Sequence, residues 1–346
     1  MPKGLLLSHP ASTAMPPFAI AHFLRRAAEG RYLRRAMEHI VATPFVIGAY
    51  ASLPVETVDQ ETYYAELGTL PWCNGLEVPF KETLHDDVAW LAARMAESFT
   101  TNILTPIPGV MGRLGSNPAY GLASTDPDGR AAAFAHLTAA NDAVRDFNDR
   151  LGHRFFTHVA LHSAPKAAAD KDAFAESLAT VLEWDWDGAI CVVEHCDAYN
   201  PELAPQKGFL TLDDELAVIA QFEGASTPIR ASINWGRSAI EGRSADLPLE
   251  HITQASDSGL LAGLIFSGAH DRDNEYGPAW DDYHVAMNVD EPTSVMTPEL
   301  VAAAIDAACP KTLDYLGAKA TLAPRYSIPE RLAILRNIAV AAGVTA

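Results

Sequence analysis

The sequence predicts an α/β protein folded as a single-domain (β/α)8 TIM barrel. Two observations indicate this fold class: eight short apolar runs alternate with amphipathic stretches from residue 45 onwards, and several runs, such as Ala189–Val193, are apolar on both faces. Strands that are apolar on both faces are typical of parallel sheets covered by helices. The chain has 346 residues, which suits a barrel because this fold takes about 250 residues and often carries insertions.

A doubly wound open sheet is the alternative, because it is also built from repeated βα units. No G-x-G-x-x-G motif follows the first apolar run, and its absence weakens the dinucleotide site that such a sheet often carries.

The apolar runs define the expected strands. In chain order they are Phe45–Tyr50, Gly75–Pro79, Thr101–Pro106, Phe156–His162, Ala189–Glu194, Ile229–Asn234, Leu261–Ser267 and Leu313–Lys319. Stretches with an apolar residue every three or four positions predict helices at 84–98, 130–151, 170–183, 211–223 and 297–308, and one more after Ser327. Thr297 begins its helix as a cap, with proline in the first helical position and an acid in the first turn.

Two connections are much longer than the others, Pro106–Gly129 and His270–Met296. Long connections in compact domains are usually functional or disordered. Both follow the carboxyl ends of strands, where barrel active sites lie, so we expect them to cover a pocket. Most acidic residues of the second connection are expected on the surface.

Composition excludes several classes of partner. The chain has 25 basic and 44 acidic residues and a net charge of −19, which repels phosphate backbones and anionic lipids, so neither nucleic acid nor a membrane surface is an expected partner. No apolar run approaches the roughly 18 residues of a membrane helix. The four cysteines form no C-x-x-C pair, which is typical of reduced thiols in a cytoplasmic protein.

The first 36 residues differ from the rest, with six basic residues and a single acid, Glu29. The arginines follow the apolar stretch Phe18–Leu24, the reverse of the order in a secretory signal. We therefore expect residues 1–36 to be a weakly ordered extension, residues 37–346 to be the barrel, and the native start to lie near Met37.

Polar residues that end the strands form the candidate site, because these ends meet at one mouth of a barrel. Glu194 follows a buried apolar run, and a carboxylate there is costly to bury unless it is paired or metal-bound. It is either catalytic or part of a salt bridge to Lys319 or Arg237 that only closes the barrel. Glu77, in the middle of its run, is either catalytic or part of an ion pair in the barrel floor. His162 is also a catalytic candidate, although lone buried histidines are commonly structural, because it ends a strand.

A second set of strand-end residues is expected to bind substrate: His195, Asp197, Asn234, Trp235, Arg237 and His270. Arg237 would clamp a carboxylate or phosphate through paired hydrogen bonds, or form a surface salt bridge. His195 should point away from Glu194, Asp197 can cap a turn, and Trp235 can pack in the core.

Motifs of the common hydrolases are absent from the sequence. It contains no G-x-S-x-G nucleophile motif and no H-E-x-x-H zinc-protease motif.

The strand ends resemble those of the xylose isomerase-like TIM barrels, a superfamily of sugar isomerases and epimerases. The landmarks are Gly75-Leu76-Glu77, His162 and Val193-Glu194. The runs Phe45–Ser52 and Glu194–Ala198 more closely resemble a bacterial branch that is labelled only as a domain of unknown function. The resemblance covers roughly residues 45–343.

The resemblance implies a divalent metal, Mn²⁺ or Mg²⁺, held by carboxylates and a histidine at strands 5 to 8. Glu194 and His270 match two of these positions and are the expected ligands. Asn234 stands where the superfamily has an aspartate, and Lys319 where it has an acid, so the ligand set is incomplete. We hypothesise that Lys319 takes over part of the metal's role in stabilising an enediolate, with Glu194 and Glu77 as the base and acid.

The function that follows is an enzyme that isomerises or epimerises a sugar or sugar acid by removing a proton next to a carbonyl. A carbohydrate lyase that uses the same acid and base is the second hypothesis, and a non-catalytic sugar-binding barrel is the third. The expected partner is a small carbohydrate, and a homo-oligomer is compatible with the sequence.

Overall fold

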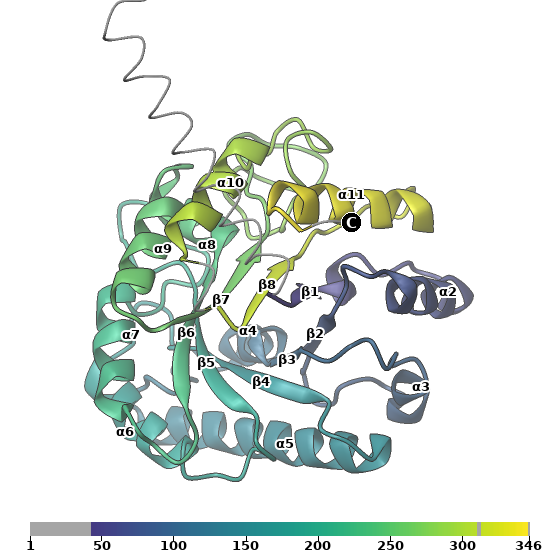
Figure 1. Cartoon of the computed structure of the whole chain (residues 1–346). Coiled ribbons are helices and arrows are strands. Elements are labelled where there is room, and N and C mark those ends of the chain that lie inside the picture. Colours follow the sequence, from purple (N-terminus) through teal and green to yellow (C-terminus); the bar gives the residue numbers. More distant parts are fainter. Residues whose placement is uncertain (1–42, 310–312, 345–346) are drawn as a thin grey trace, which may run out of the picture.

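The computed structural model describes residues 43–309 and 313–344. The predicted extension 1–36 and the predicted start near Met37 lie outside these residues. Eight parallel strands pair in chain order, and β1 also pairs with β8, which closes the sheet into a barrel. Helices surround this sheet (Figure 1). The predicted (β/α)8 TIM barrel is therefore confirmed.

Every predicted strand overlaps an observed one, and only β5 extends beyond its predicted range, by one residue. The strands are β1 (Phe45–Ile47), β2 (Gly75–Pro79), β3 (Asn102–Thr105), β4 (Phe156–Leu161), β5 (Ile190–His195), β6 (Ile229–Asn234), β7 (Leu261–Phe266) and β8 (Tyr315–Ala318). Their residues are almost all buried, as expected for parallel strands with the barrel interior on one side and helices on the other.

The helices on the outside follow the strands. They are η1 (Ala49–Ala51), α2 (Thr57–Thr69), α3 (Val88–Ala92), α4 (Ile107–Ser116), α5 (Pro127–Leu151), α6 (Lys171–Val181), α7 (Leu212–Ile219), η2 (Ala220–Phe222), α8 (Trp235–Gly242), α9 (Leu247–Asp257), α10 (Pro298–Ala307) and α11 (Ile328–Ala341). Among the residues that the structure describes, none of these helices is long and apolar enough to cross a membrane.

Capping residues define where several helices begin. The Thr297 side chain accepts a hydrogen bond from the Leu300 amide at 3.3 Å, so α10 begins at the cap that the sequence predicts. Ser327 and Glu330 form a capping box at the start of α11. The expectation that 106–129 is a loop is wrong, because this stretch contains α4, whose Ile107 and Val110 are buried.

Apolar side chains fill the middle of the barrel interior. Val46, Ile103, Ala160, Val192, Ala262, Ile265 and Tyr315 form one buried cluster. Gly263 makes room for Tyr315, because a Cβ atom at this glycine would lie 2.0 Å from the tyrosine ring. The Tyr315 hydroxyl donates to Ser232 Oγ at 2.9 Å within this interior. Most of the predicted site residues lie at the carboxyl end of the barrel.

Candidate active site at the barrel mouth

The first feature of the mouth is a buried ion pair between Glu77 of β2 and Lys319, which directly follows β8. Lys319 Nζ donates to Glu77 Oε1 at 3.0 Å, and the two side chains are 0% and 4% exposed. β2 and β8 both pair with β1. Gly48 directly follows β1, and a Cβ atom on this glycine would lie 2.8 Å from Lys319 Cγ and 3.1 Å from Glu77 Oε2. Within the described residues, Glu77 Oε2 accepts no hydrogen bond.

Burial and the neighbouring charges set the protonation of this pair. Burial raises the pKa of Glu77 above its ordinary value, and the charge of Lys319 offsets only part of that effect. Burial by itself lowers the pKa of Lys319. The charge of Glu77 and the other acidic neighbours of Lys319 raise this pKa by more than burial lowers it, so the ammonium stays charged. The Tyr50 ring lies 5.0 Å from Lys319 Nζ. Because burial raises the Tyr50 pKa, its hydroxyl stays protonated.

The second feature is Glu194, whose two carboxylate oxygens are both engaged. Glu194 Oε1 lies 2.7 Å from an Arg237 guanidinium nitrogen and 3.5 Å from the Asn234 amide nitrogen. Glu194 Oε2 lies 3.0 Å from His162 Nε2. Burial raises the Glu194 pKa, but Arg237, His162 and Lys319 lower it more, and the result is well below the ordinary value.

Loop residues hold Arg237 in place. Its Nε donates to Asp282 Oδ2 at 3.3 Å, and another guanidinium nitrogen lies 3.4 Å from Cys196 Sγ. Asp282 also accepts a hydrogen bond from Lys207 Nζ at 2.5 Å. No local pattern predicts a role for Lys207, and most acids of the Asp282 loop are expected on the surface, yet the Asp282 side chain is only 8% exposed.

The mouth is closed over these groups. Ser267 Oγ donates to Asn234 Oδ1 at 2.7 Å and lies 3.2 Å from His284 Nδ1, which belongs to the connection that follows β7. Asp197 Oδ2 accepts a hydrogen bond from the Lys207 backbone amide at 2.8 Å. His270 Nδ1 lies 2.9 Å from the backbone carbonyl oxygen of Arg272. Within residues 43–309 and 313–344, Asp197 Oδ1 and His270 Nε2 have no hydrogen-bond partner although both are buried.

Most predicted site residues therefore come together, and two do not. Glu77, Glu194, His162, Asn234, Arg237 and Lys319 form one network, with Asp197 and His270 in the loops that cover it. His195 follows the inward-facing Glu194 and therefore points to the outer face of β5. Its Nδ1 lies 2.7 Å from Glu215 Oε2, and its Nε2 lies 3.1 Å from Glu241 Oε2. Trp235 packs in the hydrophobic core. Neither His195 nor Trp235 reaches the mouth, contrary to the expectation that they bind substrate.

The donors at the mouth do not fit the divalent metal that the superfamily resemblance implies. Glu194 is already paired with Arg237 and His162, and the Lys319 ammonium stands at the strand-8 position. Glu194 and His270 belong to no group of three converging metal-binding side chains in the part of the chain that the structure describes. A metal ion here would lie beside two buried cations, so we derive no chemistry from it.

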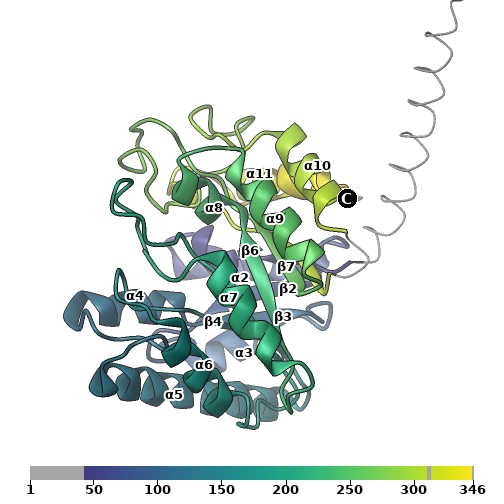
Figure 2. The same cartoon turned by 90° about the vertical axis from the view of Figure 1, so that its left-hand side faces the viewer.

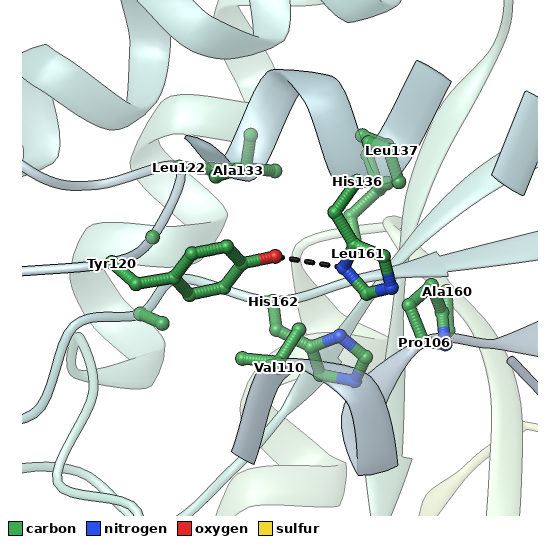
Figure 3. Close-up of a pocket in the computed structure, with 12 residues that line it drawn as sticks. Pro106, Val110, Tyr120, Leu122, Ala133, His136, Leu137, Ala160, Leu161 and His162 are labelled. Atoms are coloured by element: carbon green, nitrogen blue, oxygen red, sulfur yellow. Dashed lines mark hydrogen bonds between the residues drawn. The ribbon is translucent and has the colours of Figure 1, made fainter. Parts of the chain in front are cut away.

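A small cavity adjoins the mouth behind His162. Figure 3 shows it among α4, α5 and β4, with Tyr120 and His136 on its wall and a 2.8 Å hydrogen bond between them. Its volume is about 20 Å³, enough for a water molecule and far too small for a sugar. It contacts no other predicted site residue.

Comparisons of the sequence with known proteins identify a family and a relative. The family model of a domain of unknown function, DUF4862, matches residues 46–334. A protein of Salmonella typhimurium strain LT2, described as uncharacterised, is 36% identical over 306 residues, which are 85% of this chain and 95% of that protein.

Several solved structures share the barrel. The IolI protein with a bound zinc atom aligns over 86% of this chain and 98% of its own, with a TM-score of 0.55 and 10% identity. D-psicose 3-epimerase in the presence of D-fructose aligns over 82% and 93%, with a TM-score of 0.50 and 12% identity. A xylose isomerase-like TIM barrel/4-hydroxyphenylpyruvate dioxygenase fusion protein aligns over 85% of this chain and 42% of its own, with a TM-score of 0.53 and 10% identity. At these identities the likeness concerns the fold alone.

Proposed function

Since the chain belongs to the DUF4862 family and has the fold of the xylose isomerase-like TIM barrels, as its strand ends predict, we propose that it isomerises or epimerises a sugar or sugar acid. The observation that carries this proposal is the Glu77–Lys319 pair. One carboxylate oxygen is held by the ammonium at 3.0 Å, and the other accepts no hydrogen bond from the described residues.

Glu77 is the group proposed to transfer the proton. A base works best when its pKa lies near the working pH, and burial raises the pKa of Glu77 in that direction. The proton on the carbon next to the carbonyl moves to Glu77 Oε2, and its electron pair moves onto the carbonyl oxygen to give an enediolate. Return of the proton from Glu77 to the neighbouring carbon, with transfer of the hydroxyl proton on that carbon to the former carbonyl oxygen, gives the isomer. The epimer forms when a water molecule protonates the original carbon from the opposite face and Glu77 then returns its proton to water.

Lys319 is proposed to stabilise the enediolate. An ammonium has three donors, and the hydrogen bond to Glu77 takes one of them. A buried cation stabilises a developing oxyanion strongly because little water screens it. This assignment keeps the role that the sequence analysis gave to Lys319.

Glu194 is proposed to position other groups rather than to act as the base. Both of its oxygens are engaged and its pKa lies well below the ordinary value, so it is a poor proton acceptor. It holds Arg237 and His162 at the mouth. Since all these groups are buried, a substrate reaches Glu77 only after the covering loops move.

Solvent deuterium exchange tests the proposal. Ketoses, aldoses and sugar acids are incubated with the protein in D₂O, and loss of C–H signals is followed by NMR. Glu77→Gln should lower the exchange rate by about 10²-fold or more. Glu223→Gln, an exposed carboxylate, should exchange at the wild-type rate.

Three results would contradict the proposal. Exchange by Glu77→Gln at the wild-type rate would show that another group takes the proton. A sugar that raises the melting temperature of the wild-type protein but exchanges no hydrogen would indicate a non-catalytic sugar-binding barrel. Formation of an unsaturated product would indicate the lyase instead.

A further inference from the structure

Three side chains that commonly bind metals converge outside the barrel, away from the mouth. His195 comes from the outer face of β5, Glu241 from α8 and His251 from α9, and these two helices lie side by side (Figure 2). His195 Nε2 lies 3.1 Å from Glu241 Oε2, and His251 Nε2 lies 3.7 Å from Glu241 Oε1. The three ligand atoms all lie within 4.8 Å of one another. The histidines are buried, and the Glu241 side chain is 17% exposed.

Each histidine is also held through its other ring nitrogen. His195 Nδ1 lies 2.7 Å from Glu215 Oε2 on α7, and His251 Nδ1 lies 3.0 Å from Ser238 Oγ on α8. When Glu215 is ionised its carboxylate can only accept, and His195 Nδ1 then carries a proton. Metal-binding histidines almost always donate their second nitrogen in this way, which fixes the ring and directs the free lone pair of Nε2 at the metal.

The contact between His195 Nε2 and Glu241 Oε2 needs either a proton or a metal ion between the two atoms. With its proton on Nδ1, a neutral His195 would turn an Nε2 lone pair toward a carboxylate. A second proton on the imidazole can fill this place, but it joins only His195 and Glu241 and does not bind His251.

We propose that His195, Glu241 and His251 bind one Zn²⁺ ion. Zinc takes imidazole nitrogens and carboxylate oxygens at about 2.0–2.2 Å in a tetrahedron, so neighbouring ligand atoms lie about 3.4 Å apart. The observed separations of 3.1 and 3.7 Å fall on either side of that value, but they involve different oxygens of Glu241, so a small rotation of this carboxylate would bring one oxygen to both histidines. A divalent cation neutralises Glu215 and Glu241 together. The fourth position, on the partly exposed side of Glu241, is left for water.

The ion would join three elements behind the mouth. It links α8 and α9 to the end of β5, one residue from Glu194, which holds Arg237 and His162. Glu241 Oε2 also accepts the Ala198 amide at 2.8 Å, so the loop after β5 is tied to the same group. The role inferred for the ion is structural, and it is independent of the isomerase proposal.

Metal titration of the full-length protein tests the site. After treatment with a chelator, the protein is titrated with ZnCl₂ by calorimetry and with CoCl₂ by visible absorption. We expect one ion per chain and the cobalt absorption of a four- or five-coordinate site. His251→Gln and Glu241→Gln should each weaken zinc binding at least 100-fold. His153→Gln, a variant of an exposed histidine, should bind as the wild type does.

Two results would overturn the site. One is zinc binding by His251→Gln and Glu241→Gln with wild-type affinity. The other is a folded wild-type protein, checked by circular dichroism, that binds no zinc in the titration. If the variants do not fold, X-ray absorption of the zinc-loaded wild type decides instead: two imidazoles and one carboxylate are expected, and any other ligand set overturns the site.

Discussion

Removal of Lys319 measures how strongly the buried pair at the mouth is coupled. Lys319→Met keeps the aliphatic length but removes the ammonium that lies 3.0 Å from Glu77 Oε1. Loss of one partner of a buried pair costs about 3–5 kcal/mol of unfolding free energy, because the other charge stays uncompensated. Glu77 can avoid this cost by taking up a proton.

Protonation makes the cost depend on pH. Burial raises the pKa of Glu77 in the folded protein and Lys319 lowers it, so in Lys319→Met it rises further above the value of about 4.3 in the unfolded chain. A neutral Glu77 therefore makes its full contribution to the unfolding free energy below about pH 4.3. This contribution declines by about 1.4 kcal/mol for each pH unit above that. The penalty in Lys319→Met is then limited to about 2 kcal/mol at pH 6, and it reaches the full 3–5 kcal/mol by pH 8.

Urea unfolding at pH 6 and pH 8 checks these values with four proteins: wild type, Lys319→Met, Glu77→Gln and the double variant. Glu77→Gln/Lys319→Met buries no charge, so it should lose less than about 1.5 kcal/mol at both pH values. A double variant as unstable as Lys319→Met at pH 8 would refute the coupling. A penalty in Lys319→Met that is the same at pH 6 and pH 8 would refute the role of Glu77 protonation.

Three further substitutions probe other contacts. Gly48→Ala would place a methyl group 2.8 Å from Lys319 Cγ, so deuterium exchange should slow at least tenfold, and an unchanged rate would show that the pair does not need this space. Arg331 is buried and donates to four backbone carbonyl oxygens. Arg331→Met should therefore lower the unfolding free energy, measured in urea, by about 3 kcal/mol, and a loss below about 1 kcal/mol would contradict this. Burial raises the pKa of Asp314, but a hydrogen bond from His158 and a nearby guanidinium lower it below 3.8. Stability should therefore fall as the pH drops below about 4, and Asp314→Asn should lose less melting temperature than the wild type between pH 5 and pH 3.

The strands could be predicted because local sequence decides them. A strand that is buried on both faces has to be apolar throughout, and alternation then decides which face carries a polar residue. Glu77 and Glu194 point inward for this reason, and His195, the residue after Glu194, points outward. The sequence analysis noted that direction for His195 but did not identify its partners Glu215 and Glu241, which lie on two different helices.

The rest of the site depends on contacts between distant loops. Lys207 and Asp282 are 75 residues apart and pair only after the loops at the mouth fold against each other, and no local pattern marks either residue. Helix α4 was missed for a different reason. Its glycines and proline resemble a loop, and burial of Ile107 and Val110 on one side supplies the stability that propensity does not.

The proton-transfer role of Glu77 can be tested most directly by measuring sugar binding and deuterium exchange in the same samples of wild type and Glu77→Gln. If Glu77 takes the proton, the variant binds the sugar within a few-fold of the wild-type affinity while its exchange rate falls by about 10²–10⁴-fold. Exchange at the wild-type rate in Glu77→Gln with the sugar bound would contradict this role.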